Sequence, residues 1–139
     1  MLTAGIIAEY NPFHNGHALH IQRVRQMGAD AVVCVISGCF TQRGEPAVIS
    51  KRARTVCALK GGADLVISGH LHGGMVRIPG LGGMMSPKFK LMPEYDYGMF
   101  EYGDSMMLVS RGLGAHTIKV RINNNPELVN LKILAKSGL

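Results

Sequence analysis

The chain has no tryptophan, few aromatic residues (6%) and only three cysteines among its 139 residues. Cys34, Cys39 and Cys57 are odd in number and lack CxxC spacing, which argues against a disulfide framework and against a cysteine metal site. The longest unbroken apolar run is Ala31–Ile36, whereas a membrane span needs roughly 20 residues. The opening residues lack the basic region of a signal peptide. We therefore expect a cytoplasmic protein with no membrane partner.

The composition nevertheless allows a folded core, because hydrophobic residues make up 47% of the chain and charged residues 17%. The formal net charge of +6 favours anionic partners such as nucleotides or RNA. This charge is spread evenly over both halves of the chain, so a solvated surface explains it equally well.

The first half of the chain alternates between strand-like and helix-like segments. The short apolar runs predict buried strands, and the segments with a 3.6-residue period predict helices. In chain order these are a strand at Thr3–Ala8, a helix at His17–Met27, a strand at Ala31–Ser37, a helix capped by Ser50 and ending at Lys60, and a strand at Asp64–Ile67. This pattern predicts an α/β fold with a three-stranded parallel sheet and two helices.

The second half has a different composition, with 11 of the 18 glycines and seven of the nine methionines. We expect strands at Met106–Ser110, Ile118–Ile122 and Glu127–Leu134, and a long loop over residues 79–104. This change of composition divides the chain into residues 1–67 and residues 68–139. We expect the second part to be mostly β and either to extend the first sheet or to pack beside it.

The stretch EYNPFHNGHALH, residues 9–20, places a histidine-rich loop between a predicted strand and a predicted helix. Ligands of open α/β sheets bind at the carboxyl ends of the strands, and helix amino ends attract anions. His14 and His17 can donate hydrogen bonds to phosphate oxygens there, and Gly16 lets the backbone approach closely. Such a loop suits nucleotidyl transfer, where positioning and charge stabilisation do most of the work. The alternative is a pair of loop histidines satisfied by the backbone.

The segments AGIIAEYNPFHNGHALHIQ and ISGCFTQRGEPAVISKRARTVCALKGGADLV resemble the N-terminus of the tRNA(Met) cytidine acetate ligases. That family belongs to the Rossmann-like, HIGH-type nucleotidyltransferases, and the likeness covers residues 1 to about 67. It implies activation of acetate by ATP to acetyl-adenylate, with Mg²⁺ as an optional companion, and acetyl transfer to the wobble cytidine of tRNA.

The resemblance also implies site residues. His14 and His17 are the implied catalytic pair. Arg43, Glu45 and Lys51 lie in the matching SGxFxQRGEPA region, where Arg43 could contact phosphate or RNA, or could be an ordinary surface residue. The implied ATP-binding residues are Ile7, Ala8, Glu9, Tyr10, Asn11, Pro12, Phe13, His14, Asn15, Gly16, His17, Ala18, Leu19 and His20.

A second cluster, SGHLHGG at residues 68–74, follows the third predicted strand. His70 and His72 can turn toward one point, so this loop is a candidate metal site. Residues 63–134 resemble the C-terminal part of calcineurin-like metallophosphoesterases, in which such a loop supplies ligands to a pair of Mn, Fe or Zn ions. The other ligand motifs of that family (DxH, GDxxD and GNH) do not occur upstream.

The chain thus resembles one family up to residues 63–66 and another after them, as a gene fusion, a recombination product or a deliberate chimera would. Three hypotheses follow. The chain is an ATP-binding nucleotidyltransferase with acetate and tRNA as further partners, a metal-dependent phosphoesterase, or an inactive relic in which both sites are cut. Exposed apolar surface would favour self-association in each case.

Overall fold

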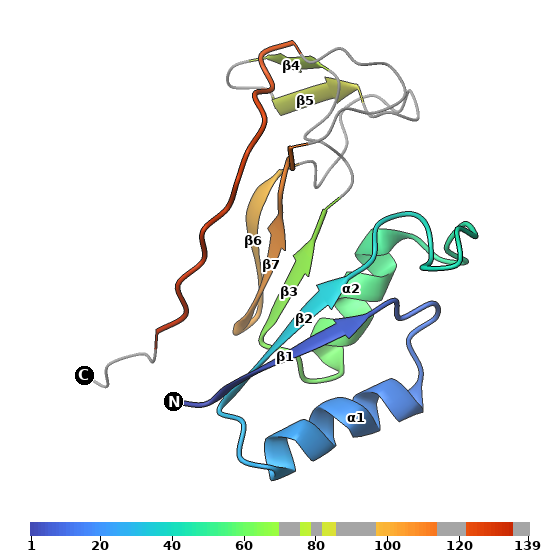
Figure 1. The fold of residues 1–139 in the computed structure, drawn as a ribbon, viewed down its shortest axis with the longest axis vertical. Helices are drawn as coiled ribbons and strands as arrows, with labels where there is room; N and C mark the ends of the chain where they lie inside the picture. Colours follow the sequence, from blue (N-terminus) through green and yellow to red (C-terminus); the bar gives the residue numbers. More distant parts are fainter. Residues whose placement is uncertain (70–75, 79–81, 86–96, 114–121, 135–139) are drawn as a thin grey trace.

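The computed structural model describes residues 1–69, 76–78, 82–85, 97–113 and 122–134 (Figure 1). These residues form a five-stranded sheet with two helices, a separate two-stranded sheet and an extended C-terminal segment. The predicted metal ligands His70 and His72 lie outside the described residues, as does most of the strand expected at Ile118–Ile122.

The first half contains two consecutive strand–helix–strand units. In chain order they are β1 (Thr3–Ala8), α1 (Asn15–Gln26), β2 (Ala31–Ile36), α2 (Lys51–Lys60) and β3 (Leu65–Ser68). Strand β2 pairs in parallel with β1 on one side and with β3 on the other. This confirms the predicted three-stranded parallel sheet with two helices. Helix α1 begins two residues earlier than predicted, because its cap is His14.

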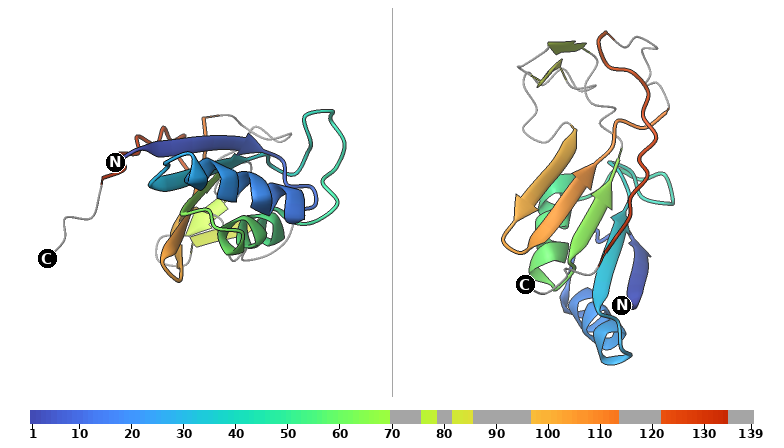
Figure 2. Two further views of the ribbon diagram at one scale, coloured as in Figure 1. Left: turned by 90° about the horizontal axis from the view of Figure 1, so that it is seen from below. Right: turned by 90° about the vertical axis from the view of Figure 1, so that its left-hand side faces the viewer.

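Both helices pack on the same face of the sheet (Figure 2). Their apolar side chains Ile21, Ala58 and Leu59 join a buried cluster with alternate strand residues such as Ile6 and Val32. This arrangement is expected when two right-handed crossovers follow one another in the same direction along a sheet. Among the residues that the structure describes, neither helix is long and apolar enough to cross a bilayer.

The second half extends this sheet. Strand β7 (Ser105–Val109) pairs in parallel with β3, and β6 (Gly98–Tyr102) pairs antiparallel with β7, so the strand order is β1-β2-β3-β7-β6. The sheet therefore crosses the predicted boundary near residue 67. Strands β4 (Val76–Ile78) and β5 (Gly82–Met85) form the separate antiparallel pair.

Two expectations for the second half were wrong. The predicted loop over residues 79–104 contains β5 and β6, because glycine-rich strands have no strong local signal. The described segment 122–134 forms no strand where one was expected at Glu127–Leu134. Leu131 instead packs on the sheet face that the helices leave free, where it contacts the cluster formed by Val33, Leu65 and Leu108. Leu128 and Leu134 of the same segment are exposed.

Glu127 anchors the C-terminal segment 122–134 to the chain that follows β7. The Arg111 backbone N–H and guanidinium donate to the two carboxylate oxygens at 3.2 and 3.5 Å, and the Glu127 N–H donates to the Gly112 carbonyl at 3.1 Å. Burial would raise the pKa of Glu127, but the hydrogen bonds from Arg111 and Tyr97 outweigh it and lower that pKa. The carboxylate therefore anchors the segment to the end of β7.

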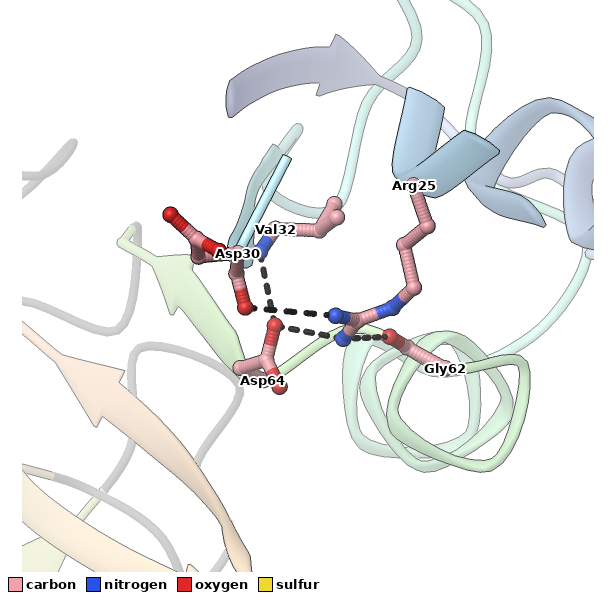
Figure 3. Close-up of polar contacts among 5 residues, drawn as sticks. All are labelled: Arg25, Asp30, Val32, Gly62 and Asp64. Atoms are coloured by element: carbon pink, nitrogen blue, oxygen red, sulfur yellow. Dashed lines mark hydrogen bonds and ion pairs between the residues drawn. The ribbon is translucent and has the colours of Figure 1, made fainter. Parts of the chain in front are cut away.

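A polar cluster fixes the opposite end of the sheet, where β2 and β3 begin (Figure 3). The Asp64 carboxylate accepts from the Arg25 guanidinium and from the Val32 N–H, both at 2.6 Å. Arg25 also donates to the carbonyls of Gly62 at 2.9 Å and Asp30 at 3.4 Å. The last turn of α1 is thereby tied to the starts of two strands, which leaves the other end of α1 positioned beside the carboxyl end of β1.

Candidate nucleotide-binding site

A cleft of about 450 Å³ lies at the carboxyl end of β1, a volume within the usual range for small-molecule sites. It is lined by the last strand residues, the loop that follows them and the first turns of α1: Ile6, Ile7, Ala8, Glu9, Tyr10, Asn11, Pro12, His14, His17 and His20. Most residues of the predicted ATP set therefore meet in one place. Those outside the lining are Phe13, Asn15, Gly16, Ala18 and Leu19.

His14 and His17 form a reciprocal cap at the start of α1. The His14 Nδ1 accepts from the Gly16 N–H at 3.1 Å, and the His17 Nδ1 accepts from the His14 N–H at 3.2 Å. The two rings stack with their centroids 3.7 Å apart. Gly16 leaves room for this fold-back, because a Cβ at that position would lie 3.0 Å from the His14 ring and the ring would have to shift slightly.

These caps also fix which imidazole nitrogen carries the proton. A nitrogen that accepts a hydrogen bond has a free lone pair, so in the neutral ring the proton is on the other nitrogen. Both rings therefore present a Nε2–H, and no described residue accepts from either one. The arrangement supplies two neighbouring donors beside the positive end of a helix, where an anionic group is favoured.

Aromatic side chains support the His17 ring. Its centroid lies 4.9 Å from that of Tyr10 and 5.5 Å from that of Phe13. Tyr10 is buried, shares a 3.3 Å hydrogen bond with the Cys34 thiol and has a left-handed backbone (φ 49°), which is unusual for a bulky residue. Such conformations persist where the surrounding structure holds them, and they are frequent in ligand-binding loops.

His17 is held neutral. Burial lowers its pKa, and the neighbouring rings of His14 and His20 lower it further. Protonation would also put a hydrogen on the Nδ1 that accepts the capping bond. His17 therefore acts at neutral pH as an uncharged hydrogen-bond donor.

Arg54 links the histidine loop to the second helix, and sequence reasoning missed it. The side chain is completely buried; its guanidinium donates to the Glu9 carbonyl at 2.7 Å, to the Ser37 hydroxyl at 3.0 Å and to the Gly38 carbonyl. One side chain thus joins the chain leaving β1 to the chain leaving β2. The periodicity of ISKRARTVCALK predicts an inner face of Ala53, Val56 and Leu59, and Leu59 is indeed buried. Ala53 and Val56 are only half-buried, whereas Arg54, Thr55 and Ala58 are buried.

The loop between β2 and α2 is attached to the histidine loop by two further contacts. The Asn11 side-chain oxygen accepts from the Val48 N–H at 2.7 Å, and the Glu9 carboxylate accepts from the Gln42 N–H. Arg43 and Glu45, which sequence comparison with the ligases singled out, are exposed on this loop and do not line the cleft. Asn11 and Glu9 therefore shape the loop as well as line the cleft.

Lys51 lies in the first turn of α2 and is also outside the lining of the cleft. Its ammonium donates to the Gly69 carbonyl at 2.6 Å, just beyond the end of β3. Burial lowers the pKa of Lys51 to about 8; Cys39 acts against this shift, and Arg54 adds to it. Within the described ranges, no group of three or more His, Cys, Asp or Glu side chains could hold a metal ion.

Comparison with known proteins shows what the first half of the chain is similar to. Residues 1–68 match the family model described as HIGH Nucleotidyl Transferase. Two relatives named tRNA(Met) cytidine acetate ligase, from Acetivibrio thermocellus and Bacillus subtilis, are 60% and 59% identical to this chain over 68 residues. Each match covers 48% of this chain and 16% of the relative, so the chain spans about one sixth of their length.

Among solved structures, Thermotoga maritima TmcAL bound with alpha-thio ATP is 49% identical to this chain. The match covers 49% of this chain and 17% of that one, with a TM-score of 0.47. The resemblance predicted for the first half is thereby confirmed by the sequence matches. The family match ends at residue 68, and these comparisons give no support for the predicted metallophosphoesterase segment.

Proposed function

We propose that the first half of the chain binds ATP and positions it for nucleotidyl transfer. The observation that carries this proposal is the stacked pair His14 and His17, which cap α1 through Nδ1 and keep both Nε2–H groups for a ligand. A fixed pair of N–H donors beside a helix amino end suits the oxygens of a triphosphate. The match of residues 1–68 to the HIGH nucleotidyl transferases supports the same function.

The proposed reaction is the one named for the relatives, with acetate and tRNA as the further substrates. A carboxylate oxygen of acetate attacks the α-phosphorus of ATP, the new P–O bond forms, and pyrophosphate leaves. The acetyl-adenylate then passes its acetyl group to the cytidine amine of tRNA and releases AMP. His14 and His17 orient phosphate oxygens and stabilise the developing charge, so no protein nucleophile is required. A Mg²⁺ ion arriving with ATP would be held chiefly by phosphate oxygens and water.

A cap-preserving variant separates this function from the folding of α1. His14→Asn keeps a good N-cap residue, and His17→Gln keeps the acceptor that completes a capping box. We expect the double variant to retain the helix content of the parent, measured by far-ultraviolet circular dichroism. ATP at about 100 times its dissociation constant should stabilise the parent by about 2.7 kcal/mol, and the double variant should lose this stabilisation. Leu19→Ala, on the same helix but outside the cleft, is the matched control.

The outcome of this titration decides between hypotheses. An unshifted melting temperature of the parent in ATP would remove the nucleotide-binding proposal. ATP binding together with acetate-dependent exchange of labelled pyrophosphate into ATP would support the full proposed reaction. ATP binding without exchange would leave a binding relic, the third hypothesis from the sequence.

Three further predictions from the sequence concern the phosphoesterase activity, the cellular location and self-association. The phosphoesterase hypothesis and its metal pair depend on His70 and His72, outside the described residues, so we do not extend the proposal to them. The cytoplasm, where ATP and tRNA are abundant, remains the proposed location. Self-association also remains a proposal, and the structure suggests where it would occur.

A further inference from the structure

Strand β1 forms one of the two edges of the five-stranded sheet (Figures 1 and 2). In the described part of the chain it pairs with β2 on one side, and its other side has no neighbouring strand. An edge strand presents a row of unpaired N–H and C=O groups, and these groups are complementary to another extended chain. The chemistry of this edge therefore specifies a β-strand as its partner.

The sequence of β1 carries none of the usual protection against such pairing. Its six residues, TAGIIA, include no charged residue and no proline. The other edge, β6, has the sequence GMFEY and includes the carboxylate of Glu101. Natural proteins commonly place a charge or a proline on edges that must stay unpaired. The two edges of this sheet thus differ in the feature that controls strand addition.

An apolar patch adjoins the unprotected edge. Ile7 is 91% exposed and lies beside Val35, its register partner on β2, which is 41% exposed. Val33, two residues away on the same sheet face, is instead buried beneath the C-terminal segment through Leu131. That segment therefore covers the middle of the face and leaves the β1 side open.

We propose that β1 pairs antiparallel with β1 of a second copy of this chain across a two-fold axis. In this arrangement the unpaired edges of the two copies bond to each other, so neither copy keeps a free β1 edge and the assembly stops at a dimer. It also keeps the same faces together, because an axis perpendicular to the sheet places the helices of both copies on one side. The exposed Ile7 and Val35 side chains of both copies then lie on the other face of the continuous sheet, with one pair on each side of the two-fold axis.

The pairing bears on the cleft, and this part of the inference rests on the proposed function. Ile6, Ile7 and Ala8 line the cleft from β1, so its β1 side ends at the sheet edge. Nucleotide sites of open α/β sheets lie in a crevice with strands on both sides. In the antiparallel dimer the amino end of the partner's β1 lies beside the carboxyl end of this one and supplies the second wall.

Analytical ultracentrifugation of the full chain over a range of concentrations, without ATP, tests the dimer independently of the proposed function. We expect a monomer–dimer equilibrium, and Ile7→Lys should raise the dimer dissociation constant by at least about tenfold, because lysine on an edge blocks strand addition. The control Met99→Lys places the same charge at an exposed apolar residue (51% exposed) of β6, the other edge of the sheet, and it should leave the constant unchanged. A parent that stays monomeric, or a dimer insensitive to Ile7→Lys, would overturn the proposal.

Hydrogen exchange locates the interface without any substitution. Raising the protein concentration should slow exchange at the amides of β1 and leave those of β6 unchanged. Slowing confined to β6, or larger assemblies with no protection at β1, would overturn the proposal in the same way. ATP titration of the parent at protein concentrations below and above the dimer dissociation constant then shows whether the second wall affects nucleotide affinity, which is a separate question from whether the dimer exists.

Discussion

The buried guanidinium of Arg54 donates to the main-chain carbonyl of Glu9 over 2.7 Å and so connects helix α2 to the first residue of the histidine loop. The same guanidinium reaches the Ser37 hydroxyl and the Gly38 carbonyl at the end of β2. Two loops that leave neighbouring strands at the same edge of the sheet are therefore held by one side chain. The cleft owes its shape to this contact as well as to the histidines that line it.

The substitution Arg54→Lys tests that role. A lysine cannot reproduce the planar fork that bonds several acceptors, so at least one buried carbonyl would lose its donor. We expect a loss of about 1–3 kcal/mol of unfolding free energy, measured by urea denaturation. We also expect weaker ATP binding by the folded protein, measured at a temperature where the variant is fully folded. Unchanged ATP affinity in a destabilised variant would show that Arg54 acts on stability alone.

A second prediction concerns the loss of stability at acidic pH. The pKa of His17 is lowered in the folded protein, chiefly by burial, whereas in the unfolded chain it returns to about 6.5. Between these two values the unfolded state binds more protons, so the free energy of unfolding should fall as the pH drops through this window. His17→Gln has no such titration and keeps the capping acceptor, so its stability should fall less over the same range. Parallel pH profiles for the parent and the variant would contradict the assignment.

Lys51 should affect the pH dependence of stability in the alkaline range. Its pKa is lowered to about 8, so between pH 8 and its ordinary value near 10.4 the unfolded chain binds more protons than the folded one. The free energy of unfolding should therefore gain from this group as the pH rises above 8. Burial raises the pKa of Tyr10 and Cys34, which acts in the opposite direction at higher pH. The difference between the parent and Lys51→Met isolates the lysine, and it should grow in the parent's favour from pH 8 to pH 10.

Gly61 should be intolerant of a side chain for a steric reason. It ends α2 with an ordinary right-handed backbone, but a Cβ there would clash with the Phe13 ring, which in turn packs against Tyr10 and His17. We expect Gly61→Ala to cost about 1–3 kcal/mol of unfolding free energy, as overpacking usually does. Gly5→Ala is the control, since a Cβ at that position meets nothing within 4 Å. Equal melting temperatures for the two variants would argue against the close Phe13 contact.

The sequence predicted those elements whose signals are local. The Ser50 cap, the helix end at Lys60 and the apolar runs of β1 and β2 each require only neighbouring residues to form, and the structure has them. The histidine loop was predictable for the same reason, since its strand, glycine and helix start follow one another directly.

Features set by distant parts of the chain could not be predicted in this way. Arg54 is buried because carbonyls from two strand ends converge on its guanidinium. The sequence pattern of α2 contains no signal for these distant acceptors. The apolar residues of Glu127–Leu134 suggested a strand, but the segment pairs with no strand and Leu131 packs on the face of the sheet. The pairing of β3 with β7 joins residues about forty positions apart, and only tertiary structure decides it.

The stacked imidazoles at the start of α1 are proposed to hold the phosphates of ATP. The most direct test is an ATP titration followed residue by residue by NMR of the backbone amides. We predict that the amides of residues 7–20 shift with one common dissociation constant, that those of β6 do not shift, and that the cap-preserving double variant at His14 and His17 shows no response. An absence of shifts in the parent at millimolar ATP, or shifts centred away from this loop, would contradict the account.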